Sequence, residues 1–343
     1  MTEPPIERLR VLARAIVDPR TPAARLGPVI RALASLLREL ATIRIESEQV
    51  SAEGETYTAA GRALSPTMAG RCADDTARTA VFVRGVHQAV SAAARRRTRR
   101  RAVSILYAGC GPYALLALPT MAILGPSSVE VTLLDIHKTS SESAQTVVEA
   151  LGLGACVAAV ETTDATEYRI APSRRPDLLL SETMNACLAK EPQVTIAWNL
   201  HRQAPGAALV PETIRVVGCL LDPSKEFSFA EAESGMAPAP ACRDRVSLGT
   251  VFELSARTIA SWTNLDAGWI PGGSIAIPNP LDPRYVPMLL TEVLVHGEHL
   301  LRDYDSGLTL PKHIPLAAQP RGGETLAFRY RLGRHPGLEC EVL

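Results

Sequence analysis

The stretch Val-Ser-Ile-Leu-Tyr-Ala-Gly-Cys-Gly, residues 103–111, decides the fold. Its first six residues favour a buried β-strand, a Gly-x-Gly turn follows, and helix-compatible residues continue to Ile123. Further strand patterns lie at 129–135, 155–164 and 177–182, and a helical pattern occupies 141–151. Apolar strands that alternate with helices are typical of a parallel sheet covered on both faces. The sequence therefore predicts an α/β domain built on such a sheet.

The region before this stretch is predicted to be helical. Apolar residues recur at helical spacing from residue 6 to about 48, with Pro19, Pro22 and Pro28 expected to separate short helices, and again from Pro66 to about Ala94. The second pattern ends in a basic run at 95–101. This run indicates either a nucleic-acid or membrane patch or a solvated helix end. A solvated helix end is the favoured interpretation, because no aromatic residues lie among the arginines.

After Pro211 the pattern changes to short β-strands without helices between them, which predicts an antiparallel sheet or barrel. The strand patterns lie at 214–221, 274–277, 288–295 and 324–332, and residues 231–240 indicate a loop or a protruding arm. We therefore expect three parts along the chain. They are a helical N-terminal region that serves as a cofactor lid at 1–100, the α/β domain at 101–212, and an antiparallel β-barrel-like substrate domain at 213–343.

The composition excludes several classes of protein. The 343 residues are 46% hydrophobic and 21% charged, which excludes disorder of the whole chain. Lys and Arg number 36, as do Asp and Glu, and this neutral balance argues against a general nucleic-acid binder. The apolar run 114–124 is too short to span a membrane, and the N-terminus does not have the pattern of a signal peptide. Seven scattered cysteines without metal-ligand spacing predict a cytoplasmic protein with no metal site.

Polar and glycine residues follow the predicted strands at the edge where a parallel sheet binds ligands. Gly109 and Gly111 would let a ligand approach the backbone after the first strand. Asp135, which closes the second strand, is placed to accept hydrogen bonds from ribose hydroxyls, and Asp164 with the amide of Ala165 could read an adenine edge. Together they predict a site for an adenosine-bearing cofactor without a pyrophosphate. The alternative is that both aspartates only cap helices.

The segment Ser-Glu-Thr-Met-Asn-Ala-Cys-Leu-Ala-Lys-Glu, residues 181–191, carries two carboxylates. On one continuous helix, Glu182 and Glu191 would face opposite sides, but a bend after the strand would let them converge over the cofactor site. Two converging carboxylates suit a planar guanidinium group, whose donors match bidentate acceptors. The alternative is that both are solvated loop acids.

This segment resembles the double-glutamate loop of protein arginine methyltransferases, which are class I S-adenosylmethionine-dependent enzymes with a Rossmann-like domain and a β-barrel. Residues 74–82, Asp-Asp-Thr-Ala-Arg-Thr-Ala-Val-Phe, resemble that family's Asp-x-x-Arg-Thr-x-x-aromatic helix. The resemblance implies that Arg78 binds the carboxylate of S-adenosylmethionine and that Asp75 shapes the site. It also assigns Met184 and, in the barrel, His296 to the substrate side.

The chain departs from the family pattern at two positions of the cofactor site and in one loop near the C-terminus. Tyr107 stands where the family has an acidic residue, Tyr113 replaces a third glycine, and a Thr-His-Trp loop is not visible near the C-terminus. The resemblance therefore indicates a divergent relative, and both tyrosines are assigned to the cofactor site.

Three functions follow from these residues. The first is N-methylation of a guanidino group, with free L-arginine or a small guanidino compound of natural-product biosynthesis as acceptor, because a neutral chain does not suit basic protein tails. The second is aminocarboxypropyl chemistry, as in azetidine-2-carboxylate synthases, which Tyr107 and Tyr113 could support by cation–π contact with the sulfonium. The third is a non-enzymatic, cofactor-binding subunit. Neither nucleic acid nor membrane is expected as a partner, and a homodimer stays open.

Overall fold

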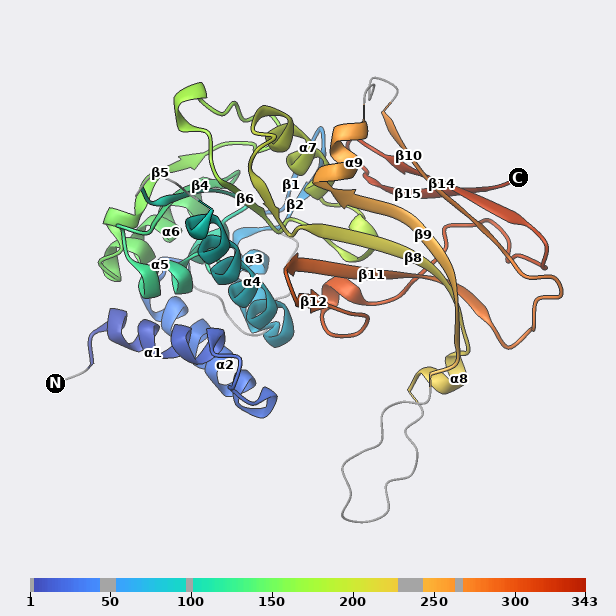
Figure 1. Cartoon of the computed structure of the whole chain (residues 1–343), viewed down its shortest axis with the longest axis horizontal. Helices are drawn as coiled ribbons and strands as arrows, with labels where there is room; N and C mark the ends of the chain where they lie inside the picture. Colours follow the sequence, from blue (N-terminus) through green and yellow to red (C-terminus); the bar gives the residue numbers. More distant parts are fainter. Residues whose placement is uncertain (1–2, 44–53, 97–100, 228–242, 263–267) are drawn as a thin grey trace, which may run out of the picture.

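The computed structural model describes residues 3–43, 54–96, 101–227, 243–262 and 268–343. Figure 1 shows an α/β part on the left, drawn largely in green, and long antiparallel strands in yellow to red on the right. Within the described residues, no helix is both long enough and apolar enough to cross a membrane.

The α/β part is built on a parallel sheet of five strands in the order β5-β4-β3-β6-β7. The strands are β3 (Val103–Ala108), β4 (Val129–Asp135), β5 (Val157–Thr162), β6 (Leu178–Ser181) and β7 (Ala208–Val210). The helices that follow them are α5 (Leu118–Leu124), α6 (Lys138–Ala150) and α7 (Gln193–Gln203). The Rossmann-like α/β prediction is confirmed, with each of the four predicted strands in place. Strand order reverses between β3 and β6, and ligands bind at such a switch point, beyond the carboxyl ends of the strands.

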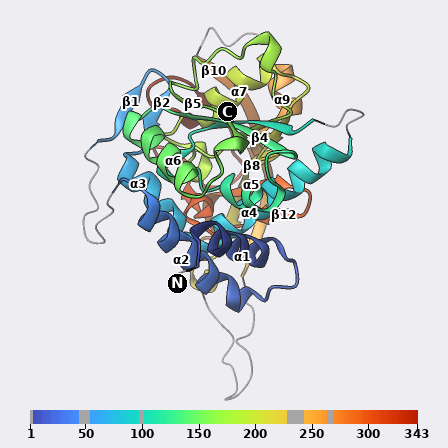
Figure 2. The same ribbon diagram turned by 90° about the vertical axis from the view of Figure 1, so that its left-hand side faces the viewer.

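Two helices, α1 (Pro5–Val17) and α2 (Ala23–Leu40), cover the α/β part from outside, as Figures 1 and 2 show. Pro19 and Pro22 lie in the link between them, as predicted, but Pro28 lies inside α2. The prediction that Pro28 separates two helices is therefore wrong. A proline inside a helix costs about 3 kcal/mol. Leu33 and Leu37 of α2 are fully buried, and burial of each leucine contributes about 1.5–3 kcal/mol, which offsets that cost.

The helical pattern from Pro66 to Ala94 divides into α3 (Pro66–Arg71), the 3-10 turn η1 (Cys72–Asp74) and α4 (Thr76–Arg95). The division occurs at Asp75, whose carboxylate accepts a hydrogen bond from the Arg78 amide at 3.0 Å and so starts a new helix. Residues 97–100 of the basic run lie outside the described residues. Arg101 forms an ion pair with Asp177 at 3.0 Å.

The C-terminal part consists of two antiparallel sheets, in agreement with the predicted strand-rich region. One sheet contains β8 (Thr213–Leu221), β9 (Arg245–Ser255), β11 (Val286–His296), β12 (His299–Leu301) and β13 (Lys312–His313). The other contains β10 (Trp269–Ala276), β14 (Thr325–Arg331) and β15 (Gly337–Val342). Short helices α8 (Pro223–Glu226) and α9 (Ala256–Ser261) flank β9. The loop or arm predicted at 231–240 lies outside the described residues.

Helix α4 joins the two parts because it packs on β11 and β12. At Gly85, a Cβ atom would lie 2.4 Å from Cγ1 of Val295, so only glycine permits this approach. A short hairpin of β1 (Thr56–Thr58) and β2 (Gly61–Ala63) precedes α3. The remaining 3-10 turns are η2 (Gly111–Tyr113), η3 (Gly154–Cys156), η4 (Pro172–Arg174), η5 (Ala186–Leu188) and η6 (Gly307–Thr309).

Candidate functional site

A cavity of about 470 Å³ lies at the carboxyl ends of β3, β4, β5 and β6. Its wall comes from the residues after these strands, from the β1–β2 hairpin, from α3 and the start of α4, and from η6 of the C-terminal part. The sequence-predicted residues that line it are Asp75, Arg78, Tyr107, Gly109, Gly111, Tyr113, Asp135, Asp164, Ala165, Glu182, Met184 and Glu191. The topology therefore brings together residues that are more than 100 positions apart in the chain.

The Gly-x-Gly turn after β3 requires glycine. Gly109 and Gly111 have φ angles of 73° and 62°, in the left-handed region that disfavours other residues. A Cβ atom at Gly109 would also lie 2.3 Å from Cγ2 of Thr183. The turn thus lets the backbone after β3 approach the loop after the neighbouring strand β6, and both segments line the cavity.

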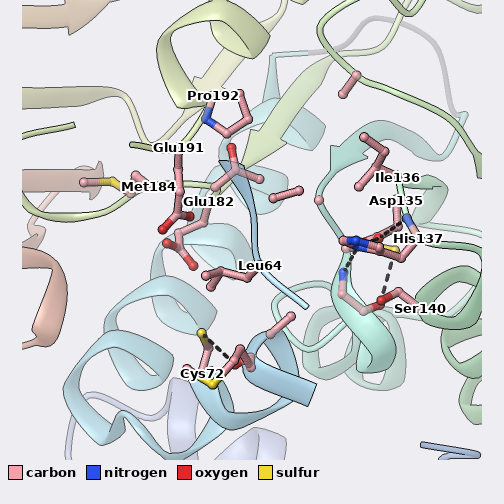
Figure 3. Close-up of a pocket in the computed structure, with 18 of the residues that line it drawn as sticks. Leu64, Cys72, Asp135, Ile136, His137, Ser140, Glu182, Met184, Glu191 and Pro192 are labelled. Atoms are coloured by element: carbon pink, nitrogen blue, oxygen red, sulfur yellow. Dashed lines mark hydrogen bonds and ion pairs between the residues drawn. The ribbon is translucent and has the colours of Figure 1, made fainter. Parts of the chain in front are cut away.

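Asp135 is held in place by the backbone on both sides. Its Oδ2 accepts a hydrogen bond from the Gly111 amide and its Oδ1 one from the His137 amide, both at 2.9 Å. The residue is 8% exposed. Because each carboxylate oxygen can accept two hydrogen bonds, Asp135 can still accept from a ligand hydroxyl. Figure 3 shows it beside His137 and Ser140, on the opposite side of the cavity from the glutamates.

Asp164 and Ala165 form the neighbouring part of the wall. Oδ1 of Asp164 accepts hydrogen bonds from the amide and the hydroxyl of Thr166, at 2.8 and 2.7 Å. This arrangement is a local turn, and among the described residues only Oδ1 takes part in it. The second carboxylate oxygen is left for a ligand.

The loop after β6 bends so that its two glutamates face the same cavity. Cys187, Leu188 and Lys190 have positive φ angles of 58°, 57° and 71°, which turn the chain back on itself. The side chain of Glu182 is 5% exposed and that of Glu191 is 7% exposed, so neither is a solvated loop acid. Figure 3 shows the two carboxylates side by side, and both residues line the cavity.

Each glutamate has an arginine of the same chain beside it. Arg78 forms an ion pair with Glu182, and its Nη1 donates to the Cys72 carbonyl at 3.0 Å. Arg62 of the hairpin lies with its Nη2 3.8 Å from Oε1 of Glu191. The Nε atoms of both arginines are buried and have no hydrogen-bond partner among the described residues.

Burial raises the pKa of Glu191 to about 7, although Arg62 and Arg78 act in the opposite direction. Removing a carboxylate from water penalises its charged form more than the two nearby arginines favour it. A carboxyl group with a pKa near neutrality can change its proton during a reaction at physiological pH, which is the property that a general base requires.

Asp75 connects the start of α4 to the C-terminal part. Besides capping α4, it accepts hydrogen bonds from the Ser306 hydroxyl at 2.7 Å and from the Gly307 amide at 3.2 Å. Gly307 and Leu308 also line the cavity. The contact therefore holds Arg78, in the first turn of α4, next to the η6 wall.

Two tyrosines and a methionine supply the less polar wall. Tyr107, Tyr113 and Met184 are all at most 3% exposed. Burial raises the pKa of both tyrosines, which keeps their hydroxyls neutral. The Tyr113 hydroxyl has no hydrogen-bond partner within the described ranges.

His296 is not brought together with these residues. It stands at the end of β11, where its Nδ1 lies 2.6 Å from Oε1 of Glu212, and it does not line the cavity. Its assignment to substrate binding stays a prediction that the structure does not support. In the part of the chain that the structure describes, no group of three or more His, Cys, Asp or Glu residues is placed to hold a metal ion.

Sequence reasoning missed three parts of the site: Arg62, His137 and the η6 segment. His137 carries no motif, yet its Nε2 lies 3.0 Å from Oγ1 of Thr56, so it ties the hairpin to the sheet. The two hairpin strands are only three residues long, and the turn residues Ala59 and Ala60 are not typical of a hairpin turn, so the sequence gives no clear signal for them. Nothing in the sequence of η6 indicates that it reaches a helix more than 200 residues earlier in the chain.

No family model matches this chain, and no curated protein matches it. Solved structures do. The Trypanosoma brucei PRMT1 enzyme–prozyme complex with AdoHcy has a TM-score of 0.52 at 13% identity, over 79% of this chain and 91% of that one. A crystal structure of PRMT6 has a TM-score of 0.52 at 13% identity, over 80% and 99%. Arabidopsis thaliana protein arginine methyltransferase 10, in an open conformation, has a TM-score of 0.50 at 12% identity, over 76% and 86%. At such low identity the likeness shows a shared fold.

Proposed function

We propose that this protein is an S-adenosylmethionine-dependent N-methyltransferase that acts on a guanidino group. The acceptor is free L-arginine or a small guanidino compound of natural-product biosynthesis. The observation that carries the proposal is the burial of Glu182 and Glu191, from one loop, in the same cavity as Arg78 and Asp135. The shared fold with arginine methyltransferases supports it.

The residues fit S-adenosylmethionine in three respects. A cavity of about 470 Å³ is in the usual size range for a small-molecule site. Asp135 keeps acceptor capacity for the ribose hydroxyls, and Asp164 keeps an oxygen for the adenine amine. The buried, unpartnered Nε of Arg78 is a donor that lacks an acceptor, which the carboxylate of the cofactor would provide. When bound there, the cofactor supplies an electrophilic methyl group.

Arg78 would serve both ligands. Its Nη2 holds Glu182 and its Nη1 holds the Cys72 carbonyl, so the position of its guanidinium is fixed before a ligand arrives. A guanidinium has five donors in a fixed plane, and the unused Nε lies in that plane. Arg78 therefore orients the first glutamate while it offers a donor to the carboxylate of the cofactor.

Glu182 and Glu191 would orient the acceptor guanidinium between them. Transfer of a methyl group from a sulfonium is an in-line displacement, so the main task of the protein is to position the attacking nitrogen. Carboxylates on two sides of the guanidinium fix its plane and draw its positive charge away from that nitrogen. Glu191, with a pKa near 7, is suited to accept the proton that the nitrogen loses.

A small acceptor fits the way the hairpin packs on the glutamate loop. The Arg62 amide donates to the Lys190 carbonyl at 2.8 Å, and a Cβ atom at Gly61 would lie 3.0 Å from that same carbonyl oxygen. The hairpin thus lies directly on the loop and narrows the approach for a peptide chain. The equal numbers of acidic and basic residues also do not provide the acidic surface that basic protein tails require.

The test is incubation with S-adenosylmethionine, with and without free arginine, followed by mass spectrometry of both products. The proposal expects S-adenosylhomocysteine together with a methylarginine, and both products at a rate about a hundredfold lower from the variant that carries both Glu182→Gln and Glu191→Gln. Methylthioadenosine formed without an acceptor would overturn methyl transfer in favour of aminocarboxypropyl chemistry. Absence of any turnover with a panel of guanidino compounds would overturn the acceptor class.

A further inference from the structure

The cavity contains two arginines that are each short of one acceptor. Arg62 and Arg78 both line it, and each has a buried Nε without a hydrogen-bond partner among the described residues. Buried polar atoms in native structures are almost always paired, so each orphaned donor points to a missing acceptor. Because guanidinium donors pair best with carboxylates, the cavity has places for two anionic groups.

Arg62 is not fully satisfied by its own chain. Its Nη1 lies 3.1 Å from Oε1 of Glu55, whereas its Nη2 is 3.8 Å from Glu191, which is beyond a good hydrogen bond. Glu191 is itself only partly ionised near neutral pH, because burial raises its pKa to about 7. The side chain of Arg62 is 20% exposed, so a ligand in the cavity can reach it.

The cofactor cannot supply the anionic groups for both arginines. S-adenosylmethionine has a single carboxylate, and the proposed function assigns that carboxylate to Arg78, in the first turn of α4. Arg62 stands on the hairpin that covers Glu191, on the acceptor side. The second anion must then come from the acceptor.

We propose, on the basis of the proposed function, that Arg62 binds the α-carboxylate of a free amino acid acceptor whose guanidino group lies between Glu182 and Glu191. Arg62 is therefore the residue that selects L-arginine over guanidino compounds without a carboxylate and over arginine within a peptide. Its guanidinium is positioned for this by Glu55 on one side and by the backbone contact to Lys190 on the other.

The experiment compares L-arginine with agmatine, which has the same guanidino group and no carboxylate, and with arginine amide. A charge-assisted hydrogen bond is worth about tenfold to a hundredfold in binding, so kcat/KM for arginine should exceed that for agmatine by about this factor. Arg62→Met should abolish the preference, so that kcat/KM for arginine falls to about the value for agmatine in the same variant, with the additional loss for arginine appearing in its KM. Arg62→Lys should restore part of the preference, because it keeps the charge and loses the bidentate geometry.

Arg257→Met is the matched control, because Arg257 is 80% exposed on α9 and does not line the cavity. It should leave the preference unchanged, and thermal unfolding of each variant should show that the fold is retained. If Arg62→Met lowers kcat/KM for arginine and for agmatine by the same factor, so that the preference is kept, Arg62 only positions Glu191 and the inference is overturned. Equal use of arginine and agmatine by the wild-type enzyme overturns it as well, and leaves guanidino methylation standing.

A binding measurement separates this inference from the proposed function. Calorimetry in the presence of S-adenosylhomocysteine should show that arginine binds at least tenfold more tightly than agmatine, and that Arg62→Met removes the difference. Equal binding of the two compounds would overturn the role of Arg62 even if no turnover is found. Tighter binding of arginine without methylation would overturn the reaction and leave the carboxylate site standing.

Discussion

At the scale of single residues, two opposing effects determine the protonation state of Glu191. Burial favours its neutral form, and Arg62 and Arg78 favour its charged form, yet the net result is a pKa of about 7. The two arginines do not bring the pKa of Glu191 back to its usual range, because each of them already forms an ion pair with another glutamate. Arg62 pairs with Glu55, and Arg78 pairs with Glu182. An acceptor guanidinium would add a positive charge next to Glu191 and so favour its ionised form.

This balance predicts a pH dependence. Below a pH of about 7 Glu191 is protonated in the free enzyme, so it can neither hold a guanidinium by charge nor accept a proton. We expect kcat/KM to rise as the pH increases through about 7, and we expect Glu191→Gln to remove this rise along with most of the activity. A profile without a change near 7, or one that persists in the Gln variant, would assign the proton transfer to another group.

The two glutamates should act as one unit. Glu→Gln keeps the size of the side chain and removes one charge-assisted partner, so each substitution should lower turnover by about a hundredfold through lost positioning. Because the guanidinium needs both carboxylates, the double variant should be little worse than the worse single variant. Single-turnover rates measured at saturating cofactor give the comparison. Effects that multiply would mean that the carboxylates act on different steps.

Asp135 should contribute mainly to cofactor affinity. Replacement by Ala removes the acceptor that we propose for the ribose hydroxyls, which should cost about 1.5–3 kcal/mol, or roughly ten- to a hundredfold in the dissociation constant. Calorimetric titration with S-adenosylhomocysteine measures it. Asp282→Ala is a suitable control, since the Asp282 side chain is 48% exposed and does not line the cavity. Unchanged affinity in a folded Asp135→Ala variant would remove Asp135 from the cofactor site.

At the scale of elements, the contact between α4 and η6 depends on one carboxylate. Asp75→Ala removes the cap of α4 and the hydrogen bonds to Ser306 and Gly307. Loss of a helix cap costs about 0.5–2 kcal/mol, so we expect the free energy of unfolding in urea to fall by about that amount or somewhat more. Cofactor affinity should fall with it, because Arg78 lies in the first turn of α4.

Asp74→Ala is the matched control for this substitution. Asp74 is the preceding residue, its side chain is 52% exposed, and its ion pair with Arg38 is at the surface. Surface ion pairs contribute at most about 1 kcal/mol, so this variant should change stability little and leave cofactor affinity unchanged. Equal effects of the two substitutions would mean that the cap at Asp75 has no special role.

The elements differ in how well the sequence predicts them. Those that are determined by the residues of one segment could be predicted, and those that depend on packing against distant segments could not. The parallel strands could be predicted because burial on both faces leaves continuous apolar runs such as 103–108 and 178–181. Strand β9 was missed because its first half is half-buried or exposed and so lacks a clear pattern. The predicted helix break at Pro28 was wrong because the packing of α2 on the rest of the molecule offsets the cost of the proline. The local sequence does not show this packing.

The residues of the candidate site also fall into a predictable and an unpredictable group. The residues at strand ends and in the glutamate loop could be predicted, because topology alone places the carboxyl ends of parallel strands together. Arg62 and Gly307 reach the cavity only because the hairpin folds over the glutamate loop and η6 lies against α4. Such contacts depend on how separate elements pack, and the sequence of either partner does not show them.

At the scale of the whole molecule, most of the buried apolar residues that the structure describes belong to one continuous cluster. It runs from Leu9 in α1 through the parallel sheet to Tyr330 in β14. Both Leu9 and Tyr330 are fully buried. Helix α4 packs against α1, α2 and β11, and Arg78 in its first turn lines the cavity, so α4 connects the cavity wall to both parts of the molecule.

A core of this kind should unfold as a unit, and α1 offers a test with an internal control. Leu9 is fully buried whereas Val11, two residues later, is 60% exposed. Leu9→Ala should lower the free energy of unfolding by about 2–5 kcal/mol, and Val11→Ala should change it by less than about 0.5 kcal/mol. Hydrogen exchange read separately from β4 and β11 shows how far the effect extends. If the core unfolds as a unit, Leu9→Ala lowers protection in both strands by the same free energy. A loss confined to β4 would mean that the α/β part and the antiparallel sheets unfold independently, and that the cavity between them rests on their contact surfaces alone.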